Sequence, residues 1–167
     1  MSKLTALAVS IAVLGGVWAF LSLNPLAGAT LVWVGFIAWG CYFHSGADSA
    51  ALQKTIAGMS YGAVIAGVAL YLVSSGMLGA LGVLAAPVII AVTVFALVII
   101  ASVNLLSVVP ANVYGYAATA GLALTAGTAG NAAMMNLTNP VLLVIISVVL
   151  GALFGMASGK LAGAIGK

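Results

Sequence analysis

The chain has 167 residues, of which 65% are hydrophobic and 3% are charged, and its formal net charge is +3. Because so few polar side chains cannot cover a water-soluble globule, we expect the chain to reside in lipid. The net positive charge comes from lysines that are scattered along the chain, which argues against a nucleic-acid partner. The single cysteine excludes an internal disulfide and a cysteine-based metal or redox motif.

Six apolar runs predict membrane-spanning helices, each of which needs about 20 residues to cross a hydrocarbon core of about 30 Å. The predicted spans cover residues 4–23, 25–43, 55–73, 78–101, 105–124 and 140–157, the last with a possible extension toward Lys160. Pro25 and Pro140 stand at helix starts, Pro87 starts or kinks the fourth span, and Pro110 interrupts the beginning of the fifth. We therefore expect an all-α integral membrane protein that forms a single membrane domain over residues 1–167.

The positions of the lysines predict the orientation. With six spans, all four lysines (Lys3, Lys54, Lys160 and Lys167) lie on the same side of the membrane, whereas five or seven spans would separate them. Lysine-rich loops and ends face the cytoplasm in membrane proteins. We therefore expect both termini to be cytoplasmic.

The two halves of the chain, about 1–76 and 77–167, resemble each other weakly. Gly-Phe-Ile-Ala at 35–38 corresponds to Gly-Tyr-Ala-Ala at 115–118, and Val-Ile-Ala-Gly at 64–67 to Val-Val-Leu-Gly at 148–151. Three spans per half require the two copies to be inverted relative to each other, as in many transporters whose solute path runs between the copies. Chance similarity among small apolar residues is the alternative.

Spans two and five are short or interrupted at equivalent places in the two halves, which favours a solute pathway there. Their aromatic and neutral polar side chains suit a small uncharged solute. The candidate pathway residues are Asn24, Pro25, Trp33, Phe36 and Trp39 in span two, and Pro110, Asn112, Tyr114, Tyr116 and Thr119 in span five. The alternative for the tryptophans and tyrosines is a place in the aromatic belts at the membrane surfaces.

No predicted span contains an ionisable group of the kind that proton coupling uses, since Asp48, the only acid, lies in the loop after span two. No nucleophile with a base, and no set of metal ligands, is present. The sequence therefore predicts a passive channel and not an enzyme, with neither cofactor nor metal. A sodium-coupled transporter and a non-conducting scaffold or accessory subunit are the alternatives.

Glycines recur every four residues in two of the predicted spans, where small residues let helices approach closely. Gly58 and Gly62 lie in span three, and the longer ridge in span six consists of Gly151, Gly155, Gly159 and Gly163. These ridges predict that spans three and six pack on each other or form a subunit interface. Six helices without large domains offer little surface for a self-contained pore, so we expect a homo-oligomer in the lipid bilayer.

Several short motifs resemble a known family. They are Gly-Phe-Ile-Ala-Trp at 35–39, Tyr-Phe at 42–43, Lys-Thr at 54–55, Tyr-Gly at 61–62, and Val-Pro at 109–110 followed by Tyr-Gly-Tyr-Ala at 114–117. They resemble bacterial inner-membrane proteins catalogued as domain of unknown function 1097, which implies a bacterial plasma-membrane protein. Asn-Pro-Leu-Ala-Gly at 24–28 is similar to a stretch of urea transporters, which are about twice as long. This second resemblance implies urea or a similar amide as the solute.

Overall fold

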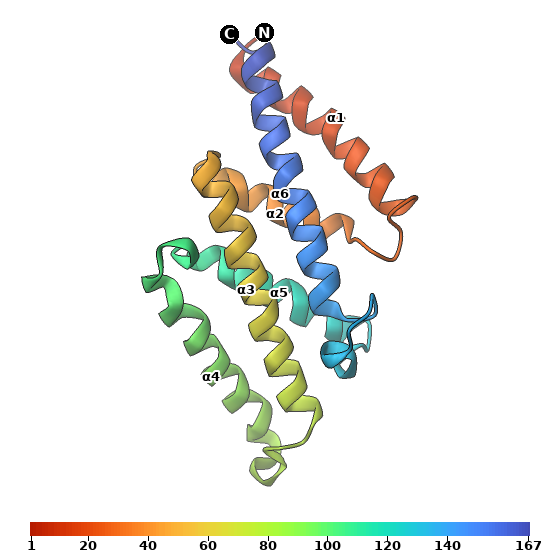
Figure 1. The fold of residues 1–167 in the computed structure, drawn as a ribbon, viewed down its shortest axis with the longest axis vertical. Helices are drawn as coiled ribbons and strands as arrows, with labels where there is room; N and C mark the ends of the chain where they lie inside the picture. Colours follow the sequence, from red (N-terminus) through yellow and green to blue (C-terminus); the bar gives the residue numbers. More distant parts are fainter. The chain divides into compact units, whose positions relative to one another are not determined.

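The computed structural model describes all 167 residues and is almost entirely helical (Figure 1). No strand is present apart from an isolated bridge between Ala27 and Thr30. Short 3-10 segments lie at Gly79–Leu84, Ile100–Ser102, Asn104–Leu106 and Ala129–Ala133. The six α-helices are α1 (Lys3–Leu23), α2 (Val32–His44), α3 (Ser49–Ser74), α4 (Ala85–Ile99), α5 (Val109–Thr125) and α6 (Pro140–Ile165).

Four helical stretches are long and apolar enough to cross a membrane, which supports a multi-pass membrane protein. They are α1, α3, α6 and the stretch Gly79–Ser102, which contains α4. In contrast, α2 has 13 residues and α5 has 17. At a rise of about 1.5 Å per residue these two helices are about 20 and 25 Å long, less than the thickness of a hydrocarbon core.

Several helix borders differ from the predicted spans; α4 begins at Ala85 and not at residue 78, and α5 begins at Val109 and not at residue 105. Helix α2 begins at Val32 and not at Pro25, because residues 24–31 form turns in which Gly28 has a φ of +80°. Helix α3 begins at Ser49, six residues earlier than predicted, because the Asp48 carboxylate accepts a hydrogen bond of 2.7 Å from the Ala51 amide and so caps the first turn. Helix α6 continues past Lys160 to Ile165.

The helices group into two compact units. The first comprises Met1–Ile56 and Ile146–Lys167, and therefore holds α1, α2 and the C-terminal part of α6. The second comprises Ala57–Ile145, and holds α4, α5 and most of α3. Each unit thus combines the first two helices of one half of the chain with the third helix of the other half.

In the first unit, α2 packs closely on both α1 and α6. A Cβ atom at Gly35 of α2 would overlap the indole ring of Trp18, and one at Gly151 of α6 would overlap the backbone of Gly35. Next along α6, an added Cβ at Gly155 would lie 3.1 Å from the Tyr42 ring. The N- and C-termini lie side by side in this unit (Figure 1), where the Lys167 amide donates a 3.0 Å hydrogen bond to the Met1 carbonyl.

In the second unit, α5 packs equally closely on α3. A Cβ atom at Gly115 would overlap the backbone carbonyl of Met59, and one at Gly62 would overlap the carbonyl of Asn112. A Cβ at Gly58 would lie 2.9 Å from the Ala111 side chain. The glycines of α3 and α6 singled out from the sequence thus face α5 and α2 respectively, whereas Gly163 near the end of α6 faces open space.

Candidate functional site

The aromatic candidates of span two lie on different sides of α2 in the first unit. Trp39 is only 2% exposed, stacks on Phe36 with a centroid distance of 5.6 Å, and donates a 3.0 Å hydrogen bond from Nε1 to Ser158 Oγ of α6. Trp33 and Phe36 are exposed. Trp39 therefore holds α2 on α6, while Trp33 and Phe36 face outward from the unit.

Hydrogen bonds within the first unit hold the turns of residues 24–31 in place. Asn24 Nδ2 donates to the Phe20 carbonyl at 2.8 Å, and Pro25 lies in the exposed turn that follows. The Leu31 amide, at the start of α2, donates to Ser147 Oγ of α6 at 2.8 Å. Since unpaired backbone groups are costly in lipid, these bonds help to satisfy the backbone where the turns lead into α2.

Span five places its polar candidates inside the second unit. Asn112 is completely buried, and its Nδ2 donates to the carbonyls of Leu106 and Leu97 at 3.1 and 3.3 Å. Asn112 Oδ1 has no hydrogen-bond partner. Thr119 is also buried and donates to the Gly115 carbonyl at 3.0 Å. Asn112 therefore joins α5 to α4 and to the segment between them, whereas Thr119 bonds within α5. Pro110 lies in the first turn of α5, and Tyr114 is exposed.

Tyr116, in contrast, lines a cavity of about 300 Å³ among α3, α4 and α5. Its hydroxyl shares a 3.1 Å hydrogen bond with Thr93 Oγ1 of α4. The other lining residues are small or aliphatic apart from Ser74, and none is charged: Ala66, Ala69, Leu70, Val73, Ala86, Ile90, Ala120, Leu124 and Ala129. The cavity is therefore suited to a small molecule with a largely apolar surface.

Sequence reasoning identified Tyr116 but missed the rest of this lining. The signal was present as helical spacing, because Ala66 and Leu70 of α3 are four residues apart, as are Tyr116, Ala120 and Leu124 of α5. Small side chains at that spacing occur throughout this chain, and only the fold shows which of them leave a space. His, Cys, Asp and Glu do not gather in any group of three that could hold a metal ion.

Comparison with known proteins gives the family. Neither a curated protein nor a solved structure matches the chain, so the similarity to urea transporters is not shown. The profile of a family described as "Protein of unknown function (DUF1097)" matches residues 8–163, which is most of the chain. The chain therefore belongs to this family of proteins of unknown function.

Proposed function

We propose that the protein is a passive facilitator for a small neutral solute, which binds in the cavity lined by Tyr116. The observation that supports this function best is the lining itself, which is almost entirely apolar and contains no charge. Its two hydroxyls are bonded within the protein, Tyr116 to Thr93 and Ser74 to the Tyr71 carbonyl. A charged solute would lose its hydration there without compensation, whereas a small neutral solute loses much less. Urea and acetamide are the first solutes to test.

The lack of ionisable residues in the second unit supports passive conduction. The whole second unit, Ala57–Ile145, contains no Asp, Glu, Lys, Arg or His. Proton-coupled transport relies on such groups inside the membrane. Chemistry on a bound molecule would need a nucleophile and base, so we propose that the protein is not an enzyme.

Sodium coupling is the second candidate, because Asn112 Oδ1 is a buried acceptor without a partner. The space around that oxygen supports the passive alternative. A Cβ atom at Gly58 would lie only 2.8 Å from Oδ1, so the oxygen faces the backbone of α3. A sodium site would require several oxygen ligands and an open volume at this point. A sodium gradient that drives solute uptake would support the coupled transporter instead.

The grouping of the helices supports an inverted repeat. Gly35 and Gly115 occupy corresponding places in the two halves, and each is the point of backbone contact with a long third helix, α6 for Gly35 and α3 for Gly115. We therefore propose six spans in two inverted halves that exchange their third helices. Residues in this arrangement that face outward from each unit, such as Trp33, Phe36 and Tyr114, remain predicted pathway residues.

The proposed setting is the bacterial inner membrane, with both termini cytoplasmic and with the chain in a homo-oligomer. The family membership, the apolar helices and the one-sided lysines support this setting.

Stopped-flow light scattering of liposomes tests the function. Vesicles that contain the purified protein are challenged in turn with urea, acetamide, glycerol, ammonia and water, with and without a sodium gradient. We expect at least one solute to relax faster than in empty vesicles. Ala120→Phe fills the cavity and should return the rate to that of empty vesicles, whereas Ala117→Phe, at an exposed position of the same helix, should not.

Two outcomes would contradict the proposal. If folded, inserted protein accelerates none of these solutes and copurifies with a second membrane protein, the chain is an accessory subunit. If Ala120→Phe and Ala117→Phe conduct equally, the solute does not pass through this cavity. Tyr116→Phe tests whether the hydroxyl contributes to solute passage, since this variant keeps the ring and removes the bond to Thr93.

A further inference from the structure

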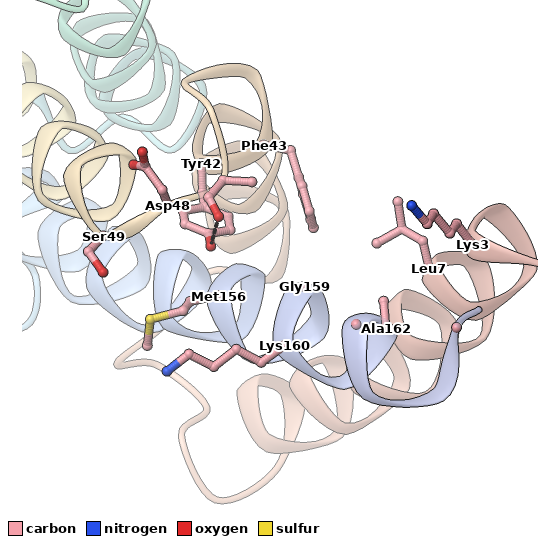
Figure 2. Close-up of a pocket in the computed structure, with 13 residues that line it drawn as sticks. Lys3, Leu7, Tyr42, Phe43, Asp48, Ser49, Met156, Gly159, Lys160 and Ala162 are labelled. Atoms are coloured by element: carbon pink, nitrogen blue, oxygen red, sulfur yellow. Dashed lines mark hydrogen bonds between the residues drawn. The ribbon is translucent and has the colours of Figure 1, made fainter.

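A second cavity, of about 490 Å³, lies within the first unit and is separate from the proposed solute site. Figure 2 shows that α1, α2 with the loop after it, and the C-terminal part of α6 each contribute to its walls. It differs from the cavity at Tyr116 in carrying charged side chains. Three of the five charged residues of the chain line it: Lys3, Lys160 and Asp48.

The two lysines give this cavity a net positive charge. Lys3 extends toward the cavity from the first turn of α1, whereas Lys160 on α6 extends past Met156, away from Lys3 (Figure 2). Both side chains are exposed, and neither ammonium group has a hydrogen-bond or ion-pair partner. The Asp48 carboxylate caps α3 through the Ala51 amide at 2.7 Å but keeps its negative charge, so the charged side chains of the lining sum to one positive charge. Both ammonium groups remain available to a ligand.

Most of the remaining lining is apolar, although Ser49 and Tyr42 also belong to it, and the Tyr42 hydroxyl donates to the Ala47 carbonyl. Leu7, Phe43 and Met156 line the cavity together with the last glycines of the α6 ridge. A Cβ atom at Gly163 would meet no atom within 4 Å, and one at Gly159 would lie 3.8 Å from the Phe43 ring. The missing side chains therefore leave a smooth apolar surface on α6, next to the two lysines.

We propose that this cavity binds an anionic phospholipid, with its phosphate paired with Lys3, Lys160 adding positive charge at the other end, and an acyl chain along Gly159 and Gly163. The charge complementarity favours an anionic headgroup over a zwitterionic one. A soluble anion would use the lysines but leave Leu7, Phe43 and Met156 uncovered, whereas a lipid covers both kinds of surface. This inference is independent of the proposed transport function and goes beyond it.

Native mass spectrometry of the purified full-length protein tests the proposal. The protein, in a neutral detergent, is titrated with dioleoyl phosphatidylglycerol, dioleoyl phosphatidylcholine or inorganic phosphate. We expect a saturable single phosphatidylglycerol adduct that phosphatidylcholine does not match. The variant Lys3→Gln/Lys160→Gln should bind phosphatidylglycerol at least about tenfold more weakly, because each lysine near an anionic headgroup contributes a roughly fivefold gain in affinity.

Matched variants separate the two parts of the site. Lys54→Gln removes a lysine of the same unit that does not line the cavity, and it should leave binding unchanged. Gly163→Leu places a side chain in the acyl groove and should weaken binding, whereas Gly16→Leu, at an equally open position of α1, should not. Equal binding of the two lipids, equal loss in Lys54→Gln, or full competition by inorganic phosphate would each overturn the lipid assignment.

Discussion

Two glycines, Gly35 and Gly115, decide how closely the helices of each unit approach. Both are buried, and a Cβ atom at either would overlap a neighbour that cannot move aside easily: an indole ring packed in the core for Gly35, and the backbone of α3 for Gly115. In lipid such close contact, and not a hydrophobic driving force, holds helices together. The requirement for glycine is therefore steric at these two positions.

Gly115→Ala is expected to destabilise the protein, because its new Cβ would overlap the Met59 carbonyl and force α5 away from α3. Overpacking of this kind costs about 1–3 kcal/mol of unfolding free energy. Gly121→Ala is the matched control, since Gly121 lies on the same helix with no atom within 4 Å of an added Cβ. Thermal unfolding followed by intrinsic fluorescence in detergent should show a lower midpoint for Gly115→Ala alone, and equal midpoints would refute close α3–α5 packing.

For Asn112, the sequence indicates an important polar group but not the groups that it bonds to. An asparagine in an apolar span was predictable as an important polar group, and its complete burial is consistent with that importance. Its role was not predictable, because its two bonds go to the carbonyls of Leu97 and Leu106, which lie 15 and six positions away along the chain. Only the fold shows that its amide nitrogen donates to these two backbone carbonyls.

At the scale of elements, two polar bonds attach α2 to α6: one from the Leu31 amide at its start, and one from Trp39, which lies among aromatic rings. Trp39 and Ser158 are both buried, and Phe154 of α6 lies 6.0 Å from Trp39 by ring centroids. The bond between Trp39 Nε1 and Ser158 Oγ is therefore shielded from solvent. A short helix such as α2, with 13 residues, depends on contacts of this kind for its place.

A double-mutant cycle measures that bond. Trp39→Phe and Ser158→Ala should each lower the unfolding free energy, and the double variant should lose less than the sum of the two, because both changes remove the same hydrogen bond. A coupling of about 0.5–1.5 kcal/mol is expected, as for hydrogen bonds inside membrane proteins. Ser10→Ala in place of Ser158→Ala is the control, since Ser10 bonds only to the Ala6 carbonyl of its own helix. Additive losses in the Trp39–Ser158 cycle would contradict the contact.

Apolar runs predicted the long helices well but not their borders or partners. Residues 25–31 are as apolar as α2 itself, so composition could not separate the turns from the helix, although Pro25 and Gly28 permit both interpretations. The glycine ridges indicated close packing, and the matching spacings predicted that α3 and α6 pack on each other or form a subunit interface. In the structure the ridge of α3 meets Ala111 and Asn112 of α5, and the ridge of α6 meets α2, whereas α3 touches α6 at Gly67.

At the scale of the whole molecule, charge is divided unequally between the two units. All four lysines and Asp48 belong to the first unit, and the second has no charged side chain. The lysines that determine the orientation of the protein in the membrane therefore all belong to the first unit. This makes the number of spans testable, because Lys54, at the beginning of α3, shares a side with Lys3 and Lys160 only if α2 crosses the membrane.

Cysteine labelling on either side of α3 distinguishes the two topologies. In a Cys41→Ala background, Ala50→Cys and Ser75→Cys flank α3 at exposed positions, and Lys167→Cys marks the C-terminal side. With six spans, an impermeant maleimide added to intact cells labels Ser75→Cys alone. If only the four long helices cross, it labels Ala50→Cys and spares Ser75→Cys. The first pattern is expected, because the second would leave Lys54 outside, against the electrostatic preference that orients the other three lysines.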